Sequence, residues 1–220
     1  MKKLACILLW IVCSHTVLSQ TITQIDSVSQ SMCLYLNQMD IKNDTLAMNN
    51  LYNKKVIPYL NTFEASKMNK VGQQVYYRLQ RNCVAFRELL DRIDPPKESV
   101  SRLAYKPKSE VSDADLQKLK NAKKLYYFEV SGDTTQVLIK DGKWLETFAD
   151  NTYSNLDMNW ITNTEFELVF NSSNNETRSN FSVQGDTYIY QVLTKENDYF
   201  VLSVNIPGQP IYEKLKIYHY

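Results

Sequence analysis

The sequence predicts an α+β protein: an N-terminal three-helix unit, then an antiparallel β-meander that forms an open or closed lipocalin-like barrel. Up to about residue 93, apolar residues recur every three or four positions, which is the period of a helical face. From Leu125 onward they alternate at every second position, as in a β-strand. The expected divisions are a signal peptide (1–19), a helical domain (20–93), a linker (94–111) and a β domain (112–220).

The first twenty residues have the composition of an export signal. Lys2 and Lys3 form a basic start, and an apolar run from Leu4 to Val12 follows them. This run is much shorter than the roughly 20 residues that cross a bilayer, and no later segment is apolar enough to do so. We therefore expect a protein exported to the periplasm or outside the cell, with cleavage after Ser19. Acylation of Cys13 is the less favoured alternative.

The composition argues against several functions. The chain has 25 basic and 24 acidic residues, and loss of the two signal lysines takes the net charge from +1 to about −1. A near-neutral protein gives no reason to expect nucleic acid as a partner. The mature chain keeps Cys33, Cys83 and His219, too few and too scattered for a metal site or for nucleophilic catalysis. No cofactor is expected, because the five glycines form no phosphate-binding loop.

Cys83 lies in the middle of the longest expected helix, which runs from Asn61 to Asp94, where two prolines follow. The apolar stripe of this helix comprises Met68, Val71, Val75, Leu79, Cys83, Phe86, Leu90 and Ile93. An earlier amphipathic helix carries Cys33 at the edge of its own stripe. Two helices that pack stripe to stripe bring these cysteines together, so an oxidising compartment predicts a Cys33–Cys83 disulfide. Two buried free thiols are the alternative.

A third apolar stripe lies between these two helices and is interrupted near Pro58. It contains Met48, Tyr52, Val56, Tyr59 and Phe63. Residues 24–93 are therefore expected to form three antiparallel helices in an up-down-up arrangement. Residues 94–112 are rich in proline, serine and charge without a steady period, which is typical of a linker. Ser112 is expected to cap a short helix after them.

From residue 125 the chain is expected to form about eight short strands joined by turns. The strand segments are KLYYFEVS, TTQVLIK, KWLETFA, NLDMNWI, TEFELVF, TYIYQVLT, DYFVLSVNI and IYEKLKIYH. A polar loop is expected at residues 171–180. Phe166 and Phe170 alternate with Glu165 and Glu167, so one face of the sheet is dry and the other is wet. A sheet of this kind curls into a barrel or is covered by a helix.

The segment "TTQVLIKDGKWLETFADNTYSNLDMNWITNTEFELVF" resembles a group of small exported β-proteins of Bacteroidota-type Gram-negative bacteria. In that group a Glu-containing strand leads to a Trp-Ile turn and then to Cys-Glu-aromatic. The matching residues here are Glu146, Trp160, Ile161, Thr164, Glu165 and Phe166. Thr164 stands where the group has its cysteine, so a bridge carried by those relatives is absent. The resemblance covers residues 125–215, implies an exported lipocalin-like sheet and implies no activity.

A ribbon of aromatic and basic side chains on the non-core face of the last three strands is the first candidate site. It comprises Tyr188, Tyr190, Tyr199, Tyr212, Lys214, Lys216 and Tyr218. Tyrosine supplies contact area at a low entropic cost, so this face could receive a small ligand or a protein partner. The alternative is that these side chains pack across the strands or against the helices of the same chain.

Two further candidates lie in the same half of the chain. Glu165 and Glu167, with Glu146, could act as the acid and base of a hydrolase, although neighbours on a wet face are the simpler interpretation. The barrel interior could hold a small apolar ligand unless large residues such as Trp144 fill it. The favoured expectation is an exported, non-catalytic binding or interaction module. A carboxylate-dependent hydrolase and a structural component of a cell-surface assembly are the alternatives.

Overall fold

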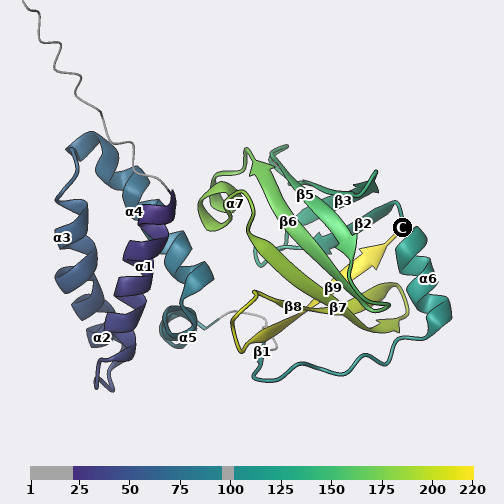
Figure 1. Ribbon diagram of the computed structural model, residues 1–220, viewed down its shortest axis with the longest axis horizontal. Helices are drawn as coiled ribbons and strands as arrows, with labels where there is room; N and C mark the ends of the chain where they lie inside the picture. Colours follow the sequence, from purple (N-terminus) through teal and green to yellow (C-terminus); the bar gives the residue numbers. More distant parts are fainter. Residues whose placement is uncertain (1–21, 96–101) are drawn as a thin grey trace, which may run out of the picture.

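The computed structural model describes residues 22–95 and 102–220 of the chain. The fold is α+β, with N-terminal helices on one side of an antiparallel β-barrel (Figure 1). Among the described residues, no helix combines the length and the apolar character needed to span a bilayer. The expected signal peptide at residues 1–19, and Cys13 within it, lie outside the described residues.

The described part of the helical unit contains four helical stretches, so the three-helix expectation is not confirmed. They are α1 (Ile22–Asn37); the continuous run of α2 (Asp44–Leu51), the π-helix η1 (Tyr52–Val56) and α3 (Ile57–Leu60); α4 (Ala65–Asn82); and α5 (Val84–Ile93). The longest expected helix is divided because Cys83 has an extended backbone, with φ −122° and ψ 102°. It also begins later than expected, with Glu64 at the N-cap position.

The π-helix η1 explains how the second stretch passes through Pro58. Proline has no N–H to donate, and in an α-helix its ring clashes with the carbonyl four residues earlier. The wider turn before it, in which the Ile57 N–H donates to the Tyr52 carbonyl, changes the hydrogen-bond register at this point. The helix therefore continues instead of breaking.

The helices enclose an apolar core of their own. Its most buried members include Ile25, Leu51, Val75, Leu79, Phe86 and Leu89. Cys33 of α1 and Cys83 between α4 and α5 form the predicted disulfide, with their Cα atoms 5.6 Å apart. The bridge joins residues 50 positions apart. Closing such a loop in the unfolded chain is worth about 4 kcal/mol in the chain-entropy model.

Eight antiparallel strands close the barrel, each at a segment expected from the sequence. They are β2 (Lys124–Phe128), β3 (Thr134–Lys140), β4 (Lys143–Thr147), β5 (Tyr153–Trp160), β6 (Glu165–Ser173), β7 (Thr187–Glu196), β8 (Tyr199–Asn205) and β9 (Tyr212–His219). Each strand pairs with the next, and β9 also pairs with β2. Of the two expected forms, open and closed, the closed barrel is therefore the one observed. A short strand, β1 (Arg102–Leu103), pairs with the start of β9.

The predicted alternation on β6 is confirmed. Phe166 and Phe170 are buried in the barrel core, whereas Glu165 and Glu167 face away from it. The core side chains come from every strand of the barrel, because each strand turns alternate residues inward. The inner face of the barrel is therefore mainly apolar, as the sequence pattern predicts.

Two short helices lie at opposite ends of the barrel. The helix α6 (Asp113–Asn121) places Leu116 and Leu119 in the barrel core, at the side away from the N-terminal helices (Figure 1). The helix α7 (Glu176–Phe181) forms within the segment expected to be a polar loop, because Asn175 caps its first turn. It contacts α4 and so lies at the junction with the helical unit.

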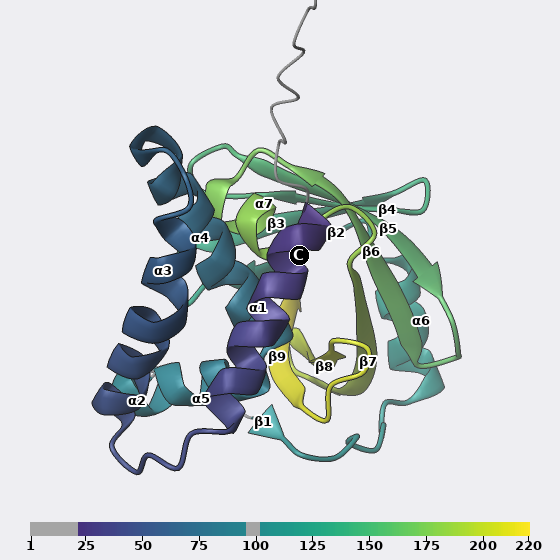
Figure 2. The ribbon, with the colours of Figure 1, turned by 60° about the vertical axis from the view of Figure 1, so that its left-hand side comes forward.

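Buried arginines of α4 join the helical unit to the barrel. Figure 2 shows α4 next to α7 in this region. Arg78 is only 3% exposed and pairs with both Asp26 of α1 and Asp186 before β7, each at 2.5 Å. Arg81 lies 3.0 Å from Asp186 and donates to the Tyr188 hydroxyl at 3.2 Å. Charges buried to this extent need partners, so these pairs fix the two parts against each other.

The end of the expected linker lies on the barrel wall. Ser109 Oγ donates a hydrogen bond of 2.7 Å to the Val192 carbonyl, and the Glu110 N–H donates another of 2.7 Å to the Leu193 carbonyl. Together with the pairing of β1 and β9, these bonds attach residues 102–111 to the strands. This described part of the segment is therefore a component of the barrel surface.

Candidate functional site

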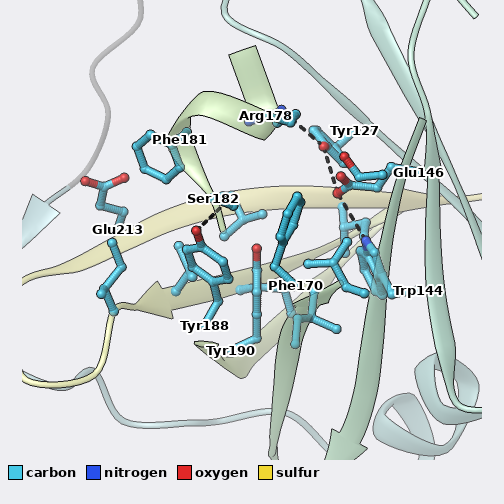
Figure 3. Close-up of a pocket in the computed structure, with 18 of the residues that line it drawn as sticks. Tyr127, Trp144, Glu146, Phe170, Arg178, Phe181, Ser182, Tyr188, Tyr190 and Glu213 are labelled. Carbon is cyan, nitrogen blue, oxygen red and sulfur yellow. Dashed lines mark hydrogen bonds between the residues drawn. The ribbon is translucent and has the colours of Figure 1, made fainter. Parts of the chain in front are cut away.

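The barrel encloses a cavity of about 360 Å³ at the end that faces α5 and α7 (Figure 3). Its apolar wall includes Trp144, Leu156, Leu168, Phe170, Leu202 and Ile217. Arg87 of α5, Phe181 of α7 and Gln209 of the β8–β9 turn line its rim. The volume is at the lower end of the range of ligand pockets, roughly 300 to 1,000 Å³. The cavity can therefore hold a small organic molecule.

Glu146 places a carboxylate on this mainly apolar wall. It follows Trp144 by two positions on β4, so both side chains face inward. Its Oε1 accepts hydrogen bonds from the Tyr127 hydroxyl at 3.0 Å and from Trp144 Nε1 at 3.2 Å (Figure 3). Burial raises the pKa of the Glu146 carboxyl, and Arg178 and the two hydrogen bonds offset this only in part. Within the described chain, Oε2 accepts no hydrogen bond.

Arg178 of α7 lies near the Glu146 carboxylate, but its guanidinium is paired with Glu129. Its Nη2 pairs with Glu129 at 2.6 Å and lies 3.4 Å from the Tyr127 hydroxyl. The Tyr127 hydroxyl thus lies between the guanidinium and the Glu146 carboxylate, and these two charges make no direct ion pair in the described residues. Desolvation lowers the pKa of Arg178, but the nearby Tyr127, Glu146 and Glu129 outweigh it and hold this pKa above its ordinary value.

Tyr188 and Tyr190 of β7 point into the cavity beside this group (Figure 3). The Tyr188 hydroxyl shares a 2.6 Å hydrogen bond with Ser182 Oγ and accepts one from Arg81. The Tyr190 ring stacks on Phe166, with centroids 5.2 Å apart and 4° between the planes. Its hydroxyl has no hydrogen-bond partner within the described residues. Burial raises the pKa of both tyrosines, so both are neutral hydroxyls at ordinary pH.

The predicted tyrosine ribbon is divided between the two faces of the sheet. Tyr188 is opposite Leu168 and Tyr190 is opposite Phe166, so both face inward, and their expected place on the outer face is corrected. The reason is that β7 carries large apolar residues on both faces, so alternation alone does not identify the inner one. The other members are on the outer face: Tyr199, Tyr212, Lys214, Lys216 and Tyr218.

The three carboxylates of the hydrolase alternative do not converge. Glu165 faces outward and pairs with Lys106 at 2.5 Å, and Glu167 lies near Asn159 on the same outer face. Glu146 lines the interior. The barrel wall therefore separates Glu146 from the other two, and the set cannot flank one glycosidic bond as an acid and a base.

Several polar residues of the cavity were not predicted, among them Tyr127, Arg178 and Glu213. Arg178 was missed because its helix replaces an expected loop. At the opposite end of the cavity, Glu213 pairs with Arg87 at 3.6 Å and with Arg102 at 3.0 Å. The sequence does contain one signal for Glu146: a strand that turns Trp144 inward must also turn inward the residue two positions later.

No comparison with known proteins assigns a function to these residues. Within residues 22–95 and 102–220, no three His, Cys, Asp or Glu side chains are grouped as a metal site would require. Searches against family models, curated proteins and solved structures give no match. The argument for function therefore depends on the cavity itself.

Proposed function

We propose that this protein is an exported, non-catalytic binding module that takes one small, largely apolar molecule into the barrel cavity. The observation that carries the proposal is the cavity of about 360 Å³, with apolar walls and a few oriented polar atoms. Pockets of this composition bury most of the surface of a small ligand and use the polar groups to orient it. The Glu146 Oε2 and the Tyr190 hydroxyl are free to do this.

Export is supported by two features. The N-terminal segment has the layout of a cleaved signal, and the Cys33–Cys83 disulfide fits an oxidising compartment. The resemblance of residues 125–215 to exported lipocalin-like proteins points the same way. A closed barrel that keeps an internal cavity suits a carrier or scavenger, because such barrels can hold one small ligand.

Binding of a neutral fluorescent probe, N-phenylnaphthylamine, tests the proposal. We expect enhanced probe emission with one site per chain. Val204 lines the cavity, so Val204→Trp fills part of it and should weaken probe binding by roughly tenfold or more.

Val201→Trp is the matched control. Val201 is on the same strand but faces outward, opposite Lys216 and Thr194. We expect this variant to bind the probe with unchanged affinity. Equal affinity of Val204→Trp and the unmodified protein, or no saturable binding by the latter, would contradict a ligand site in the barrel.

A further inference from the structure

The charges that line the cavity do not balance. Two of its three carboxylates have basic partners: Glu129 pairs with Arg178 at 2.6 Å, and Glu213 pairs with Arg87 at 3.6 Å. Glu146 accepts only neutral hydrogen bonds, from a tyrosine hydroxyl and an indole N–H. The cavity therefore contains one carboxylate without an ion-pair partner among the described residues.

Keeping a buried carboxylate of this kind in its charged form costs free energy unless a cation accompanies it. Desolvation raises the pKa of Glu146, which agrees with an uncompensated charge. Arg178 cannot supply the cation, because its guanidinium is held by Glu129 and is separated from Glu146 by the Tyr127 hydroxyl. Within the described residues no group supplies a cation to Glu146, so a positively charged ligand can fill this role.

Aromatic side chains lie beside the Glu146 carboxylate, and two of them, Tyr127 and Trp144, donate hydrogen bonds to it. The Trp144 ring lies 6.0 Å from Phe166 and 6.4 Å from Tyr190, and Tyr127 donates to Glu146 itself. Faces of electron-rich rings attract cations, most strongly in a site with little water. The free Tyr190 hydroxyl adds a hydrogen-bond acceptor for an N–H group.

We infer that the ligand of the cavity is a small organic amine, bound as its ammonium ion. The ammonium donates to the free oxygen of Glu146 and to the Tyr190 hydroxyl, while its apolar body packs against Phe170 and Leu202. A metal ion is a poorer fit, because the described residues contain no group of three or more His, Cys, Asp or Glu side chains that could hold one. This inference rests on the proposed function and specifies the chemistry of its ligand.

Two ligands of the same shape test the charge requirement. Phenethylamine is protonated at neutral pH, and phenethyl alcohol is its neutral counterpart. Displacement of N-phenylnaphthylamine, with calorimetry as a second readout, gives both affinities. We expect the amine to bind roughly tenfold more tightly or better, since a hydrogen bond to a charged group is stronger than a neutral one.

Glu146→Gln keeps the shape of the side chain and an acceptor oxygen but removes the charge. We expect it to abolish the preference for the amine while leaving the affinity for the alcohol within about threefold. The control is Glu167→Gln, which removes an outward-facing carboxylate of the same type and should keep the preference.

The outcomes separate this inference from the proposed function. If the probe binds but the amine fails to displace it, or if the alcohol binds as tightly as the amine, the amine inference is overturned and the binding function stands. The same holds if Glu146→Gln keeps the preference. If neither the probe nor either ligand binds, both fail.

Discussion

Glu146 is a residue at which the proposed ligand binding opposes the stability of the ligand-free protein. Its carboxylate is on an apolar wall, and burial raises its pKa above the usual 4.5. A carboxyl whose pKa is raised by folding binds its proton more tightly in the native state. Its stabilising contribution is then complete below the pKa of the unfolded chain and is lost as the pH rises through the raised native pKa.

We predict that Glu146→Gln stabilises the ligand-free protein at alkaline pH. The amide retains an oxygen that accepts from Tyr127 and Trp144, and it removes a charge that lacks a partner. The gain in the free energy of unfolding should be on the order of 1 kcal/mol at about pH 8 and should disappear near pH 4. Urea unfolding at a series of pH values measures both.

Glu167→Gln provides the comparison, because this carboxylate is on the outer face. Its stability should follow that of the unmodified protein throughout the series. A Glu146→Gln protein that is less stable than the unmodified one at about pH 8 would show that the charge is already compensated within the chain.

Glu146 also shows which features of single residues the sequence could predict and which it could not. Glu146 was grouped with Glu165 and Glu167 as a candidate acid or base, although its spacing from Trp144 places it inside the barrel. Tyr188 and Tyr190 were expected outside, because neither face of β7 is clearly polar. The inner side of such a strand is decided by pairing with β6, and pairing is a property of the folded sheet.

Among the structural elements, the strands were predictable and the helix boundaries were not. Period-two alternation and short turns identify all eight barrel strands, because each strand has one face in the core. The division at Cys83 is invisible to periodicity, since the apolar stripe continues across it. The helix α7 has only six residues and a polar composition, so it depends on its Asn175 cap and on contacts with α4.

The Asp186 carboxylate, just before β7, pairs with two arginines of α4 at the junction between the helical unit and the barrel. Asp186 accepts from Arg78 at 2.5 Å, lies 3.0 Å from Arg81 and accepts from the Val183 N–H. We predict that Asp186→Asn lowers the free energy of unfolding by roughly 2 to 3 kcal/mol, because it leaves buried guanidinium charge less compensated. Denaturant unfolding followed by circular dichroism measures the change.

Asp198→Asn is the control for this substitution, since Asp198 is exposed in the β7–β8 turn and its side chain makes no hydrogen bond in the described structure. A change below about 0.5 kcal/mol is expected there. A similarly small change for Asp186→Asn would mean that Asp26 alone satisfies Arg78.

On the scale of the whole molecule, two separate apolar cores meet through a polar junction. The buried residues of the helical unit form one cluster and those of the barrel form another. The contacts between them are largely arginine ion pairs and hydrogen bonds, such as Arg81 with Tyr188. Each core is then stabilised by its own burial, and the disulfide acts on the helical core alone, because both cysteines belong to it.

We therefore predict that loss of the disulfide loosens the helices and leaves the barrel intact. In a Cys33→Ser, Cys83→Ser variant, the helical unit loses up to about 4 kcal/mol of stability. Amide hydrogen exchange should accelerate in α1, α4 and α5 and remain slow in the barrel strands, whose apolar core is separate from that of the helices. The unmodified protein after reduction should give the same pattern, which separates loss of the bridge from the serine substitutions. Equal acceleration in the strands would instead establish that the polar junction makes the two cores one cooperative unit.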